Sequence, residues 1–497
     1  MLMQALDTFL RGKGTTYLSR ADFKTALEKL KVADTVESAV AEGKIIACKK
    51  GKQLVFTLPR FFEAECNIVT NYYRLQKQMK YNRDVILKYI REAERNLNIS
   101  LHEQQINAII NGITNNVAVV TGGAGTGKTS VLLAMMYCIR KLSEKAPRFS
   151  LTAPTGKASR RMCEATGMEA CTLHKLLGLT EENTETQFFI PADVVIVDES
   201  SMVDLMLAEQ LFNSVKTGAK LILVGDPNQL SSVGIGTVLK SLVLSKVVPV
   251  TQLTKTFRQD DSSTLFKNIT AIKENGILES GNDFKMVQNN GDTTNTIINL
   301  YNQKVKEYGR DNVMVLLPYR KVGVSCTNQI NAIVQKQVQC NNNPCCTVDN
   351  NHFFYVGDPV IQMENREVAN GEVGKVVYAD DNGITVQFVD CEIEYDKDEI
   401  LDNISLAYAI TVHKSQGSEA KCAICTCLNN EKAMLSKNLL YTAVTRAKKE
   451  CVLLYDNEAL HHALNTVEDE MRISLLEDKF QYTKRYMDFN RQALCRI

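Results

Sequence analysis

The segment VVTGGAGTGKTS, which begins at Val119, limits the possible folds of this chain more than any other feature. Gly122 is followed, after four residues, by Gly127, Lys128 and Thr129, which is the P-loop pattern of a strand, a glycine-rich loop and a helix. Backbone N–H groups of such a loop and the helix N-terminus bind phosphate oxygens. The segment therefore predicts an α/β fold with a nucleoside triphosphate site, where Lys128 binds the β- and γ-phosphates and Thr129 holds Mg²⁺.

Short apolar segments separated by helical stretches occur in two sets along the chain. The first set is 116–122, 149–154, 193–199 and 220–226, and the second is 312–318, 406–412, 421–428 and 450–455. Nearly continuous apolar runs of this length are typical of parallel strands buried on both faces. The pattern predicts two α/β domains in tandem, with ligands at the carboxyl ends of the strands.

The segment VVIVDESS adds two carboxylates to the predicted nucleotide site. Four apolar residues lead directly into Asp198 and Glu199, about 70 residues after the P-loop. An acidic pair at the end of a buried strand indicates that Asp198 holds Mg²⁺ and that Glu199 orients and deprotonates the attacking water. Asp-Glu pairs are common on protein surfaces, so the pair alone is weak evidence. The interpretation depends on its position directly after a buried strand.

Three segments do not fit the two predicted sheets. Residues 1 to about 58 read as short helices followed by a hairpin around Gly51, which is typical of a winged helix; a helical packing cap without nucleic-acid contacts stays open as the alternative. A charged helical stretch follows over about 60–97. Short β-like runs over about 347–404, with turn signals at Asn370-Gly371, predict a small barrel inserted in the second α/β domain.

Composition excludes several classes of protein. The 497 residues are 44% hydrophobic and 23% charged, and no apolar run approaches the ~18 residues that would span a bilayer. A net charge of +1 excludes a bulk polycation, so any nucleic-acid binding must be local. The 15 scattered cysteines favour an intracellular, reducing location, cytoplasmic if the source is prokaryotic. The clusters CNNNPCC and CAICTC lack a second pair at zinc-finger spacing and are interpreted as core thiols rather than a metal site.

Eight motifs follow one another between residues about 100 and 456: TGGAGTGKTS, TAPTGKAS, TLHKLLG, VDESSMVD, LVGDPNQLSSVG, LTKTFRQ, TVHKSQGSEA and YTAVTRAKK. In this order they resemble the motif series of superfamily 1 helicases, and within them the RecD-like group of the 1B branch. The resemblance implies two tandem RecA-like domains with an SH3-like insertion and a β-hairpin pin. The domains are then 1–97 (N-terminal region), 98–250 with a pin at about 179–191, 251–346 with 405–456, 347–404 (insertion) and 457–497 (helical extension).

The resemblance also implies roles in the nucleotide site. Gln105 corresponds to the glutamine that recognises adenine, Gln229 senses the γ-phosphate, and Arg258 and Arg446 are the arginines that reach it from the second domain. The cofactors are ATP and Mg²⁺, and the implied site residues are Gln105, Gly122, Gly123, Gly125, Gly127, Lys128, Thr129, Ser130, Asp198, Glu199, Gln229, Arg258, Gly417 and Arg446.

A second implied set lies along a groove for nucleic acid. Hydroxyls, backbone amides and a few cations suit phosphate contacts that carry no sequence information. The implied residues are Pro154, Thr155, Thr172, His174, Thr411, His413, Lys414, Ser415 and Glu419, and Gly417 and Glu419 also link the groove to the ATP cleft.

The implied activity is that of an ATP-dependent 5′-to-3′ DNA helicase acting on single-stranded and 5′-tailed duplex DNA in replication, recombination or repair. Two alternatives stay open: an RNA helicase or ribonucleoprotein remodeller of the same superfamily, and an ATPase motor subunit of a nuclease, defence or transposition complex. Phe188 and Phe189 in the pin stack on the fork or anchor the pin base. The charged C-terminal extension is a packing cap or, with the N-terminal region, a docking element for a partner protein.

Overall fold

The first α/β domain is built on a six-stranded parallel sheet with the order β6-β5-β7-β8-β4-β9. The computed structural model describes residues 2–30, 36–180, 183, 185, 188–257, 263–323, 325–339, 345–468 and 472–494. The strands are β4 (Val117–Gly122), β5 (Phe149–Ala153), β6 (Ala170–Thr172), β7 (Val194–Val197), β8 (Lys220–Gly225) and β9 (Val250–Leu253).

Alternate residues of these strands pack into two separate hydrophobic clusters, one on each face of the sheet. Val119 and Val195 belong to one cluster, and Val120 and Ile196 belong to the other. The covering helices are α6 (Glu103–Thr114), α7 (Lys128–Leu142), α8 (Gly156–Thr166), α9 (Leu173–Leu177), α10 (Leu205–Ser214) and α11 (Val238–Ser245). Burial on both faces explains why the strands read as continuous apolar runs.

The second α/β domain has a five-stranded parallel sheet with the order β10-β21-β20-β11-β19. These strands are β10 (Phe284–Gln288), β11 (Val313–Leu317), β19 (Ala409–Thr411), β20 (Ala420–Cys427) and β21 (Ala447–Tyr455). The helices around them are α12 (Thr264–Glu274), α13 (Thr293–Tyr308), α14 (Thr327–Val338), α16 (Lys437–Val444) and α17 (Asn457–Asn465). All eight strands predicted from the sequence are confirmed, whereas β6, β9 and β10 were missed because each is short or only partly apolar.

The inserted segment forms an antiparallel sheet with the order β17-β16-β15-β14-β18. Its strands are β14 (Pro359–Gln362), β15 (Val373–Ala379), β16 (Gly383–Gln387), β17 (Glu392–Asp396) and β18 (Ile404–Leu406), and β12 (Cys345–Thr347) pairs with β13 (Phe353–Tyr355) beside them. The alternating burial of β16 matches the predicted alternation of the sequence. Because β18 pairs with β14, the insertion continues to residue 406, slightly beyond the expected boundary at 404.

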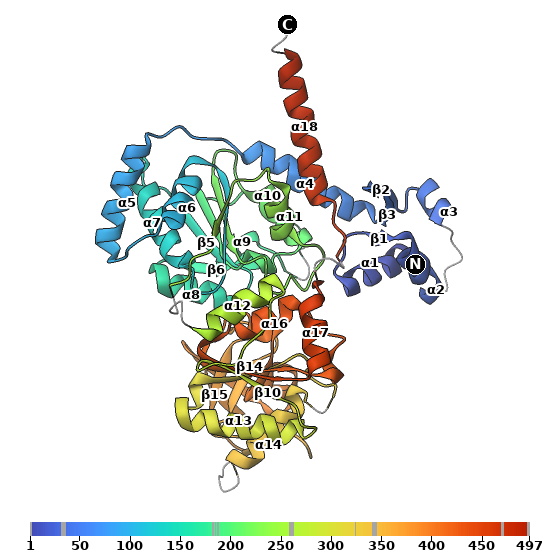
Figure 1. Ribbon diagram of the computed structural model, residues 1–497, viewed down its shortest axis with the longest axis vertical. Helices are drawn as coiled ribbons and strands as arrows, with labels where there is room; N and C mark the ends of the chain where they lie inside the picture. Colours follow the sequence, from blue (N-terminus) through green and yellow to red (C-terminus); the bar gives the residue numbers. More distant parts are fainter. Residues whose placement is uncertain are drawn as a thin grey trace.

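The N-terminal residues form a separate small module of three helices and a three-stranded antiparallel sheet. Its elements are α1 (Leu2–Lys13), β1 (Leu18–Ser19), α2 (Arg20–Leu30), α3 (Val36–Ala41), β2 (Ile46–Lys50) and β3 (Gln53–Thr57), with the sheet order β1-β3-β2. Helix α4 (Pro59–Leu75) connects the module to the first α/β domain, where it packs on α10. Helix α18 (Leu476–Leu494) starts against α4 and α11 and then projects from the molecule (Figure 1).

The expected boundary at residue 97 is wrong. Helix α5 (Arg83–Leu97) packs on α7 of the first α/β domain, with Ile86, Ile90 and Ala93 in the core of that domain. These three residues recur at helical spacing, but the charges around them favoured a linker in the sequence. The first domain therefore begins near residue 83 and, because β9 joins its sheet, ends near 253.

The sequence also led to predictions about a pin, membrane-spanning segments and metal sites. Residues 181, 182, 184, 186 and 187 of the expected pin lie outside the described residues, so the pin stays a prediction. No described helix is long and apolar enough to cross a membrane. In the described ranges no group of three or more His, Cys, Asp or Glu side chains is placed to hold a metal ion, and Cys422, Cys425 and Cys427 are buried in β20.

Candidate nucleotide cleft and strand groove

The P-loop joins β4 to α7 and lines a cleft of about 670 Å³ between the two α/β domains. Gly125 and Gly127 have φ values of 77° and 78°, a left-handed conformation that glycine adopts without strain. The Lys128 ammonium group donates hydrogen bonds to the carbonyl oxygens of Gly122 and Gly123, at 2.8 and 3.0 Å. Lys128 and Thr129 thus lie at the first turn of α7, where the helix dipole favours an anion.

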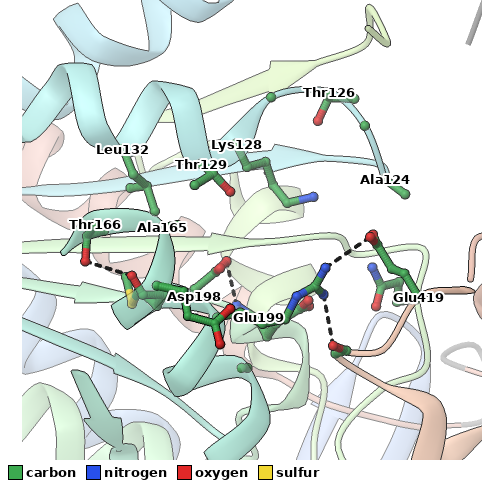
Figure 2. A pocket seen from close by; sticks show the side chains of 18 of the residues that line it. Ala124, Thr126, Lys128, Thr129, Leu132, Ala165, Thr166, Asp198, Glu199 and Glu419 are labelled. Atoms are coloured by element: carbon green, nitrogen blue, oxygen red, sulfur yellow. Dashed lines mark hydrogen bonds and ion pairs between the residues drawn. The ribbon is translucent and has the colours of Figure 1, made fainter. Parts of the chain in front are cut away.

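Asp198 and Glu199 follow β7 and face the P-loop across the cleft (Figure 2). Burial raises the pKa of Asp198, the charge of Glu199 raises it further, and Lys128 lowers it. The Glu199 N–H donates to a carboxylate oxygen of Asp198 at 2.8 Å. Glu199 has φ 49°, so the chain turns sharply here and both carboxylates point toward the cleft.

The second domain contributes Gly417, Glu419 and Arg446 to the same cleft, and Gln229 enters from the loop after β8. Arg446 is buried, which lowers its pKa, and its guanidinium donates to the carbonyl oxygens of Thr442 at 2.9 Å and Ser418 at 3.3 Å. These bonds fix the guanidinium in the wall of the cleft. The structure therefore brings the expected arginine of the second domain to the P-loop of the first.

Arg161 and Lys157 of α8 also face the second domain, although the sequence did not indicate them. The Arg161 guanidinium donates to Gly417 O at 2.9 Å and to Glu419 Oε2 at 3.0 Å. Lys157 donates to Ser418 Oγ at 2.5 Å, and burial lowers its pKa to about 8. Glu419, expected in the nucleic-acid groove, thus lies in the wall of the nucleotide cleft, where it pairs with Arg161 of the first domain and Lys448 of the second.

A further set of contacts, also missed in the sequence, joins the loop after β8 to α16. The Tyr441 hydroxyl donates to Asp226 Oδ2 at 2.7 Å, and the Leu230 N–H donates to Thr442 Oγ1 at 2.8 Å. Both ends of the Tyr441–Asp226 bond are buried, and Asp226 begins the motif that carries Gln229. Tyr441 precedes Arg446 by five residues in the motif YTAVTRAKK, and this position is the sequence feature that could have indicated a role for Tyr441.

Several predicted nucleotide-site residues lie next to the cleft rather than in its lining. Gln105 is buried under the P-loop, where its amide donates to Thr126 O at 3.1 Å and its carbonyl accepts from the His102 N–H. Gly122 and Gly123 line a neighbouring cavity of about 190 Å³. Arg258 lies outside the described residues. The preceding Phe257 donates its N–H to Gly125 O at 2.8 Å, and Ser130 is not among the lining residues.

The predicted groove residues lie at the ends of helices and strands on both domains. Thr155 and Thr172 are the N-caps of α8 and α9, Pro154 directly precedes Thr155, and His174 is exposed on α9. Thr411 ends β19, and its hydroxyl accepts from the Lys414 N–H at 3.3 Å. Both domains therefore present hydroxyl groups at the ends of their strands, and the second domain adds the Lys414 ammonium group.

Two residues of this set are enclosed by protein. Ser415 is fully buried and donates to Val412 O at 2.7 Å, so it lies beneath the surface that carries Thr411 and Lys414. His413 is partly buried and lines a cavity together with Leu230 and Met434, and burial lowers its pKa. Ser415 and His413 therefore stabilise the conformation of the motif TVHKSQGSEA.

The insertion contacts both sides of this expected groove. The Lys414 ammonium donates to Asn370 Oδ1, Arg160 of α8 forms an ion pair with Glu372, and Ala369 lies against Gly156. A β-carbon on Gly156 would overlap Ala369, which explains the glycine at the start of α8. The segment 369–372 therefore contacts both α/β domains at the position of the expected groove.

Two parallel-sheet domains that share one P-loop cleft, with an acidic pair from the first and a buried arginine from the second, define an ATPase of the helicase class. Residues 100–296 match the AAA domain family model, and residues 406–454 match the UvrD-like helicase C-terminal domain. The RecBCD enzyme subunit RecD of Mycobacterium tuberculosis is 30% identical over 397 residues, which cover 70% of this chain and 68% of that protein. The chain belongs to the RecD-like family of superfamily 1 helicases.

A second relative and one solved structure are also similar to parts of this chain. The ATP-dependent RecD2 DNA helicase of Deinococcus radiodurans is 32% identical over 358 residues, covering 70% of this chain and 48% of that protein. This chain thus spans about half the length of that relative. The crystal structure of a Bacteroides Pif1 helicase with ADP-AlF3 and ssDNA has 19% identity and a TM-score of 0.45, covering 78% of this chain and 98% of that chain.

Proposed function

We propose that this chain is an ATP-dependent DNA helicase that translocates 5′ to 3′ along single-stranded DNA and unwinds 5′-tailed duplexes. The observation that carries this proposal is the composition of the cleft. Lys128 and Glu199 come from the first domain, whereas Arg446 comes from the second. Because the groups needed for hydrolysis lie on two bodies, turnover depends on how those bodies sit relative to one another. Hydrolysis can therefore be coupled to domain movement.

Each group in the cleft has a role in this proposal. Lys128 binds the β- and γ-phosphates, Glu199 accepts a proton from the attacking water, and Arg446 neutralises charge in the transition state. Gln229 senses the γ-phosphate, Gln105 recognises the adenine edge, and Arg258 acts as a second arginine. The P-loop glycines and Ser130 surround the phosphates.

The cleft also fits Mg²⁺. The Thr129 hydroxyl and the Asp198 carboxylate line the same cavity, and Mg²⁺ prefers hard oxygen ligands of this kind. These two side chains would hold the ion, which supplies positive charge at the phosphate oxygens. The buried position of Asp198, where a carboxylate is costly without a cation, supports this assignment.

The strand path in this proposal crosses the strand ends of both domains. Thr155 and Thr172 at helix N-termini, Pro154, His174, Thr411, His413 and Lys414 line or support it, and 369–372 forms its cover. The insertion is then an SH3-like domain over the strand, and the segment around 179–191 is the pin that separates the duplex. The domain boundaries are those given above, with the first domain beginning near residue 83.

Two measurements on the purified chain test the proposal. ATP hydrolysis is measured with and without single-stranded DNA, and unwinding is then measured on duplexes that carry only a 5′ or only a 3′ tail. Strand-stimulated hydrolysis and unwinding of the 5′-tailed duplex alone are expected. Unwinding from a 3′ tail alone would contradict the direction, and preference for an RNA strand of the same sequence in competition would indicate an RNA helicase.

A second candidate function is a motor subunit of a larger enzyme. Several relatives carry the name RecBCD enzyme subunit RecD. In this chain, α18 projects from the body and exposes Tyr482 (72%) and Tyr486 (60%), which would suit a partner protein. Strand-stimulated hydrolysis without unwinding by the chain alone would favour this candidate over an autonomous helicase.

A further inference from the structure

The N-terminal module carries a β-hairpin with a strongly basic, exposed tip. Strands β2 and β3 pair with Lys50 opposite Gln53, so Gly51 and Lys52 form the turn. Lys49, Lys50, Lys52 and Gln53 are all exposed, and Gly51 has open space around its Cα. Three ammonium groups thus occupy four consecutive positions at the exposed turn of the hairpin.

Among the residues that the structure describes, no ion pair joins Lys49, Lys50 or Lys52 to a carboxylate. No Asp or Glu occurs between residues 45 and 58. Four carboxylates elsewhere in the module are already engaged, in the ion pairs Asp7–Arg11, Asp22–Lys13, Glu37–Arg20 and Glu42–Lys44. Lys50 donates to Ser474 O at 3.0 Å, which is a neutral carbonyl and leaves the positive charge in place. The tip therefore remains a site for an anion.

The N-terminal module is fixed to the first α/β domain close to the loop that carries Gln229. The Gly236 N–H donates to Gly14 O at 2.9 Å, and Arg472 Nη1 donates to Ser232 O at 2.7 Å. Glu65 of α4 is fully buried and accepts hydrogen bonds from Tyr17 and Ser474. Because these contacts hold the hairpin in one place, a ligand at its tip would have a defined orientation relative to the motor.

We infer that this hairpin is a second nucleic-acid contact, in which Lys49, Lys50 and Lys52 bind the phosphate backbone of duplex DNA outside the single-strand groove. Residues 46–54 contain no aromatic side chain, whereas proteins that bind single strands usually stack bases on aromatic rings. Lysines on an exposed turn suit phosphate contacts, which set position and do not read sequence. This inference rests on the proposed function in one respect only, namely that the nucleic acid is DNA.

The test compares the salt dependence of blunt-duplex binding for the full chain and for the variant Lys49→Ala/Lys52→Ala. Each phosphate contact contributes about 0.9 to the slope of log K against log salt concentration. Loss of two contacts should lower the magnitude of the slope by about 2 and weaken binding at low salt. The variant Lys49→Arg/Lys52→Arg keeps the charges and should bind as the original chain does.

The matched control is Lys285→Ala/Lys421→Ala, which removes two exposed lysines from β10 and β20 of the second domain. It should leave the slope unchanged. An unchanged slope for duplex binding by the hairpin variant would overturn the inference. This is also the result expected if the tip binds an acidic protein surface instead of DNA. A chain that shows the slope change but no strand-stimulated hydrolysis would refute the proposed function and leave this inference standing.

Discussion

At the scale of single residues, the cleft depends on side chains that are held by bonds from the opposite domain or from their own backbone. Arg446 is fixed by two carbonyl oxygens, and Tyr441 holds the carboxylate that begins the Gln229 motif. Arg161 connects α8 to Gly417 and Glu419. A change in nucleotide state at the P-loop can therefore reach the second domain through short, defined contacts.

Arg446→Ala should separate nucleotide binding from turnover. An arginine that neutralises transition-state charge contributes about 10³–10⁵ in rate, so strand-stimulated hydrolysis should fall by at least about 10³-fold, while affinity for ATP changes little. Hydrolysis and fluorescent-nucleotide binding are measured side by side. Because the guanidinium also bonds two carbonyls, a thermal unfolding curve checks the fold. Equal losses of binding and turnover would contradict the role.

Tyr441→Phe should weaken the coupling between the domains. The change removes the hydroxyl that donates to the buried Asp226 carboxylate, which should cost about 1.5–3 kcal/mol of stability and lower stimulation of hydrolysis by single-stranded DNA. The control is Tyr408→Phe, because Tyr408 donates to buried Asp358 at the same 2.7 Å distance but joins the second domain to the insertion, away from the cleft. If both variants lose the same fraction of stimulation, the Tyr441 contact has no special role in coupling.

At the scale of secondary-structure elements, helix ends in the first domain depend on side chains from neighbouring strands. The Lys220 ammonium at the start of β8 donates to the carbonyl oxygens of Gly112, Ile113 and Asn115, where α6 ends. Burial lowers the pKa of Lys220 to about 8, so the group still carries its charge at pH 7. It therefore acts as the C-terminal cap of α6.

Lys220→Met should destabilise the first domain. The methionine fills a similar volume but leaves buried helix-end carbonyls unpaired, and each buried unsatisfied acceptor costs about 1–3 kcal/mol. Because the chain has no tryptophan, chemical denaturation followed by circular dichroism measures the loss in free energy of unfolding. Lys216→Met, at a partly exposed lysine four residues earlier, serves as the control and should be nearly neutral. A stable Lys220→Met protein would show that water replaces the ammonium group.

At the scale of the whole molecule, the two ends of the chain are joined. Glu65 of α4 accepts from the Tyr17 hydroxyl at 2.9 Å, from Ser474 Oγ at 2.8 Å and from the Leu475 N–H at 3.2 Å, and it pairs with Lys479. Burial and Glu65 together raise the pKa of Tyr17 far above its ordinary value. The N-terminal module and the base of α18 thus form one unit around a single buried carboxylate.

Glu65→Ala should open this unit while leaving the cleft intact. Loss of the carboxylate leaves Tyr17, Ser474 and Lys479 without their shared acceptor, so hydrogen exchange at Ile473 and Leu475 and tryptic cutting near Arg472 should accelerate. Glu63→Ala, at an exposed position of the same helix, is the control. Loss of basal ATP hydrolysis in Glu65→Ala, together with unchanged exchange, would contradict a purely structural role.

The sequence by itself determined the local features of this protein. The eight predicted strands, the P-loop at Gly122–Thr129 and the acidic pair after β7 were readable because each depends on residues that are neighbours in the chain. Continuous apolar runs and glycine spacing report local conformation directly. The order of the motifs further indicated the family.

Only the tertiary structure decided which distant residues meet. Arg161 with Glu419, Tyr441 with Asp226 and Glu65 with Ser474 are separated by 258, 215 and 409 residues, and no local pattern encodes those distances. The same holds for α5, whose charged sequence resembles a linker although Ile86 and Ile90 complete the core on α7. Burial of Ser415 and the contacts of 369–372 with both α/β domains likewise follow from packing between segments, because side-chain burial depends on what the rest of the fold places against it.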